Sequence, residues 1–380
     1  MTGKETLNIA ILHNIISPYK TLLFNELCDL RDDFLVIYAA KTESIRDWTV
    51  DLGIVKFKYD VLFDIPANKI TPLSLFLATW RRLCYLRPEV VVLGGYSEAN
   101  YWAGFVWAKL HQKKLILWSS SNESDHKRYI IREQVKKFIV KGCNAFNVYG
   151  SNSRNYLVKL GAEPHRIFAT GNNTDNSFYS EEVGKRRALR DTTISKTGNA
   201  KKNFIYIGRL SPEKNVLGLL SAYSRVFAEN AEWGLILVGD GPQLAAVKEY
   251  VRENSLPRVS IVGFKQKKDI PQYLALSDVM ILPSFSETWG LVVNEAMAAG
   301  LPVFVSKKCG CYPDIVKEGE NGFSFNPNNT PELTTLMLSA ASGTMDLGKM
   351  GRRSMWLISK CTPESSAKVV SETIEFSLVS

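Results

Sequence analysis

The sequence predicts an α/β protein built from two doubly wound, Rossmann-like domains. Its 380 residues are about twice the usual length of one domain. In each half of the chain, short apolar and β-branched runs alternate with helical stretches, which is typical of a parallel sheet covered on both faces. Doubly wound sheets bind ligands outside the carboxyl ends of their strands, so we expect the site in a cleft between the halves.

The first half contains five predicted strands and then a polar stretch. The strands are the runs LNIAILHN, FLVIYAA, EVVVLGG, KLILWSS and NAFNVYG, with a helix near residues 19–30 after the first of them. Residues 181–203 are rich in Lys and Arg and have hardly an apolar residue, which predicts an exposed connection between domains. We therefore expect the first domain over residues 1–180.

The alternation of strands and helices resumes after this connection. Six strands are predicted, in the runs NFIYIGRL, WGLILVGDGP, VSIVGF, DVMILPS, LPVFVS and NGFSF, with helices near 216–230 and 243–254. Two helical segments close the chain, near 346–360 and from Pro363, because proline is favoured at a first helical position. The second domain is expected over 204–360 and a C-terminal helix over 361–380, a segment that can return to the first domain.

Composition limits the classes of partner and compartment. Lys plus Arg number 47 against 38 for Asp plus Glu, a net charge of +9 that suggests an anionic partner. The six cysteines are scattered and the N-terminal apolar run is interrupted by polar residues, so we expect a reducing cytoplasm. No apolar run reaches the length of a membrane span, so any membrane contact is expected at the surface. Cys309 and Cys311 lack the further ligands of a metal site, and none is expected.

Two short motifs at predicted strand ends favour an anionic ligand. The segment GRLSPEK begins at Gly208 and places Arg209 and Lys214 before a helix, where backbone amides already attract anions. A diphosphate fits there, although ordinary surface cations are an equal alternative for this motif alone. In the segment VGDGP, Gly239 and Gly241 allow backbone to approach a ligand, and a plain strand-to-helix turn also explains them.

The strongest motif is PSFSETWGLVVNEAMAAGLPV. Its strand ends in a loop that carries Glu287, a helix begins near Trp289 or Gly290, and Glu295 lies one to two turns inside that helix. Carboxylates accept paired hydrogen bonds from vicinal hydroxyls such as those of ribose or hexose. The motif therefore favours a carbohydrate-bearing ligand over a solvated helix face.

These motifs, in this order and followed by CGCYPDIVKEGENGFSF, resemble the donor-binding domain of GT-B glycosyltransferases of family 4, the group 1 type, over roughly residues 203–326. The runs HNIISPYKTLLFNEL, ILWSSSNESD and YLVKLGAEPHRIFATGNNTD resemble bacterial members that build surface glycans. The resemblance implies a GT-B fold and a retaining transfer of a hexose-type sugar from a nucleoside diphosphate donor, UDP- or GDP-linked, with no other cofactor. A glycan or lipid-linked saccharide is the implied acceptor.

The resemblance also assigns roles. Arg209 and Lys214 would hold the donor diphosphate, Glu295 would bind ribose hydroxyls and Glu287 would hold the transferred sugar. Backbone amides near the helix start would touch the β-phosphate, and the loop that begins at Gly263 would face the base. The remaining residues implied at the donor are Gly208, Gly239, Gly241, Phe264, Trp289, Gly290 and Leu291. Such enzymes need no metal, and the sequence has no D-x-D motif, so magnesium dependence is disfavoured.

Two departures from the family concern the first domain. The loop after its first strand reads NIISPY where many relatives have two glycines, and Pro18 removes an amide. Several relatives place a histidine after a middle strand, where this chain has SSSNE. Glu123 is the candidate catalytic substitute, with a neighbouring Ser and His126 as alternatives.

Positive charge concentrates in residues 69–141, where 13 Lys or Arg face 5 Asp or Glu. Within this segment HKRYIIREQVKKFIVKG predicts a basic amphipathic helix, with Ile131, Val135 and Phe138 in its apolar stripe together with Ile139. The helix packs on its own domain, meets an anionic membrane on the inner face of the plasma membrane, or binds a lipid-diphosphate acceptor.

Two other functional classes stay open. A nucleotide-sugar epimerase uses the same fold but needs no acceptor. A basic nucleic-acid-binding protein is disfavoured, because aromatic residues are not interleaved with the basic stretches.

Overall fold

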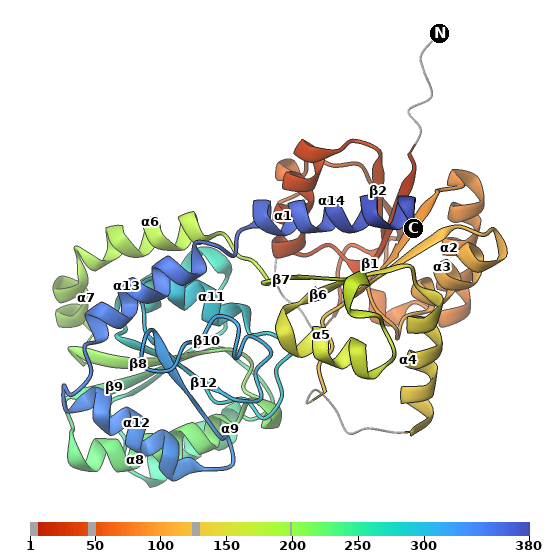
Figure 1. Ribbon diagram of the computed structural model, residues 1–380. Helices are drawn as coiled ribbons and strands as arrows, with labels where there is room; N and C mark the ends of the chain where they lie inside the picture. The colour runs from red at the N-terminus through yellow and green to blue at the C-terminus, as the bar shows by residue number, and fades with distance from the viewer. Residues whose placement is uncertain (1–6, 45–50, 124–129, 198–199) are drawn as a thin grey trace. The chain divides into compact units, whose positions relative to one another are not determined.

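The computed structural model of the protein (Figure 1) describes residues 7–44, 51–123, 130–197 and 200–380. The chain divides into two compact units. The first unit comprises Met1–Asn173 together with Pro363–Ser380, and the second comprises Thr174–Thr362. Each unit is built around one parallel sheet with helices on its faces, so the predicted α/β class is confirmed.

The first unit holds a seven-stranded parallel sheet in the order β3-β2-β1-β4-β5-β6-β7. The strands are β1 (Ile9–Ile15), β2 (Phe34–Ala40), β3 (Tyr59–Phe63), β4 (Val90–Leu93), β5 (Lys114–Ser119), β6 (Ala145–Tyr149) and β7 (Ile167–Thr170). All five predicted strands are present. The edge strands β3 and β7 were not predicted: the residues of β3 are only partly buried, and β7 is four residues long with one of them, Ala169, exposed.

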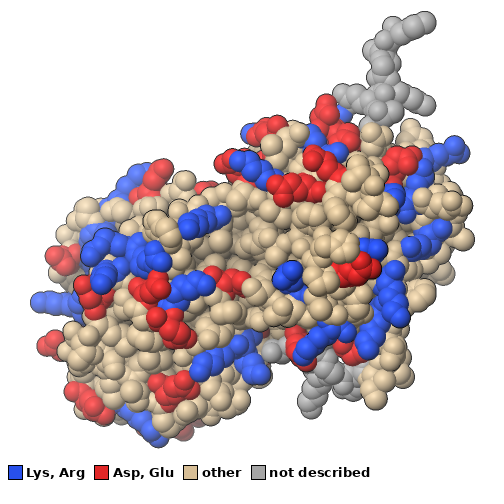
Figure 2. Space-filling view, viewed as in Figure 1, with Lys and Arg blue, Asp and Glu red and all other residues tan. Residues whose placement is uncertain are grey.

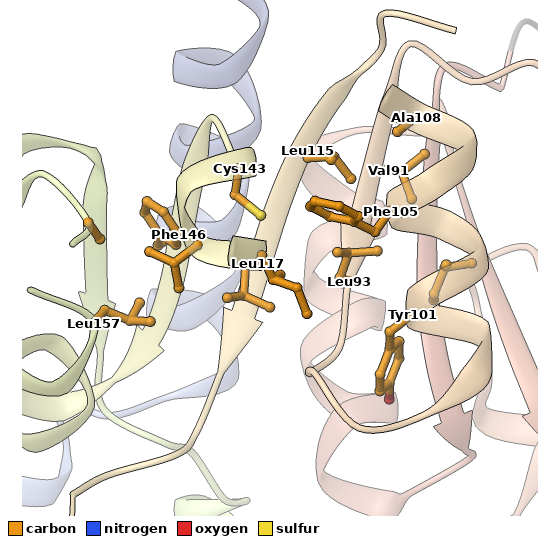
Figure 3. Close-up of a cluster of buried hydrophobic side chains, with 14 of the residues drawn as sticks. Val91, Leu93, Tyr101, Phe105, Ala108, Leu115, Leu117, Cys143, Phe146 and Leu157 are labelled. Carbon is orange, nitrogen blue, oxygen red and sulfur yellow. The ribbon is translucent and has the colours of Figure 1, made fainter. Parts of the chain in front are cut away.

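The helices of the first unit are α1 (Pro18–Leu30), α2 (Pro72–Leu86), α3 (Ala99–Leu110), α4 (Ile130–Gly142), α5 (Gly150–Lys159) and α14 (Pro363–Val379). Figure 3 shows part of the core, where Leu93 and Leu117 from the sheet lie near Phe105 of α3. The final helix α14 packs beside α1 (Figure 1). Ser366 at its start lies 3.0 Å from Thr170 Oγ1 and accepts a hydrogen bond of 3.0 Å from Asn173, so the end of the chain is fastened to the first unit.

The second unit holds a six-stranded parallel sheet in the order β10-β9-β8-β11-β12-β13. All six strands are predicted ones: β8 (Lys202–Ile207), β9 (Trp233–Val238), β10 (Val259–Gly263), β11 (Val279–Leu282), β12 (Val303–Ser306) and β13 (Gly322–Phe325). Its helices are α6 (Asn176–Arg187), α7 (Arg190–Thr197), α8 (Val216–Glu229), α9 (Leu244–Glu253), α10 (Ile270–Ala275), α11 (Leu291–Ala298), α12 (Thr330–Ala341) and α13 (Leu347–Ile358). Strand order reverses between β8 and β11, which is where doubly wound sheets bind ligands.

The segment 181–203, predicted as an exposed connection, instead contains most of α6 and all of α7. Two apolar residues, Tyr179 and Val183, are fully buried and anchor α6. The basic residues also have structural partners, since Arg190 lies 2.6 Å from the largely buried carboxylate of Asp278. The segment is therefore part of the second unit, and its many Lys and Arg residues obscured the helical pattern of α6 and α7.

Candidate functional site

Two loops of the second unit meet at the reversal point of its sheet. The loop 208–214 follows β8 and ends in a short 3-10 turn, Pro212–Lys214, and the loop 283–290 follows β11. The two strands are direct neighbours in the sheet. The amide of Phe285 donates a hydrogen bond of 2.8 Å to the carbonyl of Glu213, which fastens one loop to the other. Sequence-predicted residues of both loops are therefore held in one place.

An ion pair joins these loops. The Lys214 ammonium lies 2.5 Å from Oε2 of Glu287, and each side chain is 18% exposed. Arg209 is exposed and forms no ion pair within the described residues. Partial burial acts to raise the pKa of Glu213, but a hydrogen bond from Ser211 and the nearby charges hold that pKa below its ordinary value. The two loops thus bring the Lys214–Glu287 pair and the exposed Arg209 to the reversal point of the sheet.

The glycines after β9 bring a third loop against the first. The amide of Leu210 donates to the carbonyl of Asp240 at 2.8 Å, and that of Gly208 donates to Val238 at 2.9 Å. A side chain at Gly239 would place its Cβ 1.8 Å from the carbonyl oxygen of Gly208. At Gly241 the same atom would lie 2.4 Å from the carbonyl oxygen of Leu210. These glycines are needed for the loops to pack, whether or not a ligand is present.

The helix α11 begins directly after Gly290 and carries Glu295, which is 2% exposed. Trp289 is buried and its indole Nε1 donates a hydrogen bond of 2.9 Å to Asn294. The Trp289 side chain therefore supports the loop from inside. The first N–H groups of a helix have no acceptor within it, so the backbone at Gly290 and Leu291 remains suited to an anion.

The segment Cys309–Cys311, which the sequence did not mark as functional, is hydrogen-bonded to the loop 283–290. Cys309 and Cys311 are buried, and burial raises the pKa of both thiols. The intervening amide of Gly310 donates to the carbonyl of Glu287 at 2.9 Å, and that of Cys311 donates to Trp289 at 3.1 Å. The only sequence signal was two small residues flanking a glycine.

Gly263 and Phe264 lie at the end of β10, beside the same cluster of loops. The amide of Gly239 donates a hydrogen bond of 2.9 Å to the carbonyl of Gly263, and the Phe264 ring is 47% exposed. An exposed aromatic face next to the glycine loop suits a planar base.

Glu123 belongs to the first unit and is not part of this cluster. Its side chain is exposed and forms an ion pair with Lys159. The catalytic role of Glu123 stays a prediction. His126, and Lys127 and Arg128 of the predicted basic helix, lie outside the described residues.

Residues 190–353, within the second unit, match the family model described as Glycosyl transferases group 1. This segment is a group 1 glycosyltransferase domain. Among curated proteins, the chain is 37% identical over 134 residues to the sulfoquinovosyl transferase SQD2 of Arabidopsis thaliana, covering 34% of this chain and 25% of the relative. It is 31% identical over 218 residues to the N-acetyl-alpha-D-glucosaminyl L-malate synthase of Bacillus anthracis, covering 52% of this chain and 56% of the relative.

A solved structure similar to this chain is HepE from Anabaena in complex with UDP and glucose. The TM-score is 0.75 at 18% identity, with 97% of this chain and 99% of that chain covered. The likeness shows the GT-B fold, as predicted. The chain spans only about a quarter to about a half of the length of the two curated relatives named above. Within the described residues, no group of three His, Cys, Asp or Glu side chains is arranged to hold a metal ion.

Proposed function

We propose that the protein is a retaining glycosyltransferase that moves a hexose-type sugar from a nucleoside diphosphate donor to a glycan or lipid-linked saccharide acceptor in surface polysaccharide assembly. The observation that carries the proposal is the ion pair of Lys214 and Glu287 at the reversal point of the sheet, with Arg209 exposed in the same loop. A cation and a carboxylate side by side suit a diphosphate next to a sugar.

Each part of the donor then has a place. Arg209 and Lys214 hold the diphosphate and stabilise its charge as the sugar leaves, while Glu287 holds the transferred sugar. Glu295 accepts hydrogen bonds from ribose hydroxyls, and the helix start at Leu291 faces the β-phosphate. The base lies toward Phe264. No protein nucleophile is required, because positioning and charge stabilisation supply the catalysis.

A uracil base is the first choice for the donor, because the similar HepE structure holds UDP. The test is a thermal-shift panel of UDP-, GDP- and ADP-sugars on the whole protein. A specific donor at a hundredfold excess over its Kd stabilises the folded state by about 2.7 kcal/mol. Absence of a shift with every donor contradicts the proposal. Incubation with the bound donor alone, followed by product analysis, separates a transferase from an epimerase, since only an epimerase converts the donor without an acceptor.

The helix α4 supports a membrane-borne acceptor. Three residues of its predicted apolar stripe are exposed: Ile131 is 79% exposed, Val135 39% and Phe138 61%. Ile139 faces the core, so the helix uses one side for packing and leaves the other to solvent. Figure 2 shows Lys and Arg side chains along the side of the first unit where α4 lies in Figure 1. No helix in the described parts of the chain is long and apolar enough to cross a membrane.

Vesicle sedimentation tests this surface. We expect binding to phosphatidylglycerol-containing vesicles, weakened by salt, and little binding to phosphatidylcholine alone, since a basic residue near an anionic surface contributes about 1 kcal/mol. The double variant Ile131→Ser with Phe138→Ser should reduce binding several-fold. Val158→Ser, at a 41% exposed position on α5, is the matched control. Equal binding to both kinds of vesicle would contradict the proposal that α4 binds an anionic membrane.

A further inference from the structure

A partly buried lysine, Lys20, lies at the carboxyl end of the first unit's sheet, in the first turn of α1. The Nζ atom of Lys20 donates a hydrogen bond of 2.6 Å to the hydroxyl of Tyr149, at the end of β6. The same atom lies 3.2 Å from the centroid of the Trp118 ring on β5. Trp118 and Tyr149 are both buried. Residues from α1, β5 and β6 thus place the Lys20 amine against the rings of Trp118 and Tyr149.

Among the described residues, no carboxylate pairs with this amine. Within the described residues, Lys20 forms no ion pair, and burial alone lowers its pKa well below the ordinary value for lysine. A buried cation is normally paired, because removing a charge from water is costly. The aromatic ring faces offset part of this cost. What the cluster lacks is an anion.

His13 of β1 belongs to the same cluster. Its ring centroid lies 6.5 Å from that of Trp118 and 6.3 Å from that of Tyr38. Its Nε2 is buried and has no hydrogen-bond partner. Burial and then the charge of Lys20 lower the pKa of His13 to about 3, so the ring is neutral at physiological pH. A buried ring nitrogen beside Lys20 therefore lacks a hydrogen-bond partner.

The cluster is open to an incoming group, because Lys20 and His13 each keep part of their surface exposed. It lies beside the point where the first unit's sheet reverses, between β1 and β4, which is the ligand-binding edge of a doubly wound sheet. We propose that Lys20 and His13 form a subsite that binds a phosphate group of the acceptor, with the Lys20 ammonium as its counter-charge. This inference rests on the proposed transferase function, because it assigns the first unit to the acceptor.

The experiment observes Lys20 itself. Protein labelled with 13C at lysine Cε is titrated with pH by NMR, and Lys20→Met identifies the signal. We expect that signal to titrate well below the other lysines, and inorganic phosphate to move its titration upward by at least one pH unit, which equals a tenfold preference of phosphate for the ammonium form. Because the signal belongs to Lys20, phosphate bound near Arg209 does not enter the result.

Two comparisons make the outcome decisive. Lys20→Arg should retain phosphate binding, and Lys41→Met, which removes an exposed lysine paired with Asp64 in the same unit, should leave the Lys20 titration unchanged. A Lys20 signal that does not respond to phosphate overturns the subsite. UDP affinity should be the same in Lys20→Met as in the wild type, and a tenfold loss would overturn the acceptor assignment in favour of the donor diphosphate. Failure of every nucleotide sugar to bind would instead contradict the transferase proposal and leave the phosphate response intact.

Discussion

The ammonium of Lys214 and the carboxylate of Glu287 lie 2.5 Å apart although 73 positions separate them in the chain. The contact exists because β8 and β11 are neighbours in the sheet and their loops are hydrogen-bonded through Glu213 and Phe285. The carboxylate holds the lysine at the place proposed for the diphosphate. The two residues are therefore expected to act as one unit.

A double-mutant cycle tests this coupling. Lys214→Met and Glu287→Gln should each lower kcat/KM, and the effect of the first should change by about 0.5 to 3 kcal/mol in the presence of the second. Steady-state kinetics on the four proteins measures the coupling free energy. Effects that add to within about 0.5 kcal/mol would mean that the ion pair has no part in catalysis.

Metal removal should leave the transfer reaction intact. Arg209 and Lys214 are proposed to supply the positive charge that a divalent cation would otherwise bring to the leaving diphosphate. Activity in excess EDTA should equal activity in Mg²⁺, whereas Lys214→Ala should cost about 2 to 4 kcal/mol in transition-state stabilisation. Loss of activity in EDTA that Mg²⁺ or Mn²⁺ restores would refute this prediction.

The sequence predicted the buried strands of both sheets, because strands covered on both faces read as continuous apolar runs. It missed β3, whose residues are all half-buried, and the helices α6 and α7, where Arg190 relies on a pairing with Asp278. The loop motifs located the candidate site. The ion pair within the site could not be predicted, because the contact of Lys214 with Glu287 depends on β8 and β11 being neighbours in the sheet. Likewise, nothing in the run SPYK shows that Lys20 is buried against Trp118.

His13 should make the first unit sensitive to acid. Its pKa is about 3 in the folded protein against 6.5 for an ordinary histidine, so only the unfolded chain gains a proton between these values. Stability should therefore be complete above about pH 6.5 and fall as the pH drops, by about 2 kcal/mol at pH 5. The histidine Cε1 signal of His13, identified with His13→Gln, should not titrate by NMR between pH 8 and 5. Titration near pH 6.5 would show that the ring is solvated.

Two glycines of the candidate site should respond differently to alanine. At Gly239 the new Cβ would meet the Gly208 carbonyl at 1.8 Å, whereas at Gly263, with φ of 73°, it meets nothing within 4 Å. Gly263→Ala should lower the free energy of unfolding by about 1 to 2 kcal/mol, because alanine must adopt the left-handed conformation there. Gly239→Ala should separate two loops and cost about 3 kcal/mol or more. Calorimetric unfolding of both variants measures the difference, and equal destabilisation would contradict the loop packing.

The two carboxylates of the donor motif should affect different kinetic constants. Glu295 is proposed to bind ribose hydroxyls that do not change during the reaction, so Glu295→Gln should weaken UDP and UDP-sugar binding alike. Glu287 is proposed to hold a sugar that gains positive charge as its bond breaks. Glu287→Gln should leave UDP affinity nearly unchanged and lower kcat by about 10- to 1000-fold.

Calorimetry with UDP and steady-state kinetics separate these roles. Glu253→Gln, at an exposed position on α9, is the control for loss of a carboxylate in the same unit and should change neither constant. If Glu287→Gln abolishes UDP binding while Glu295→Gln does not, the two roles are exchanged. If neither variant changes binding or rate, the carboxylates support the fold of α11 and its loop, and the donor is held elsewhere.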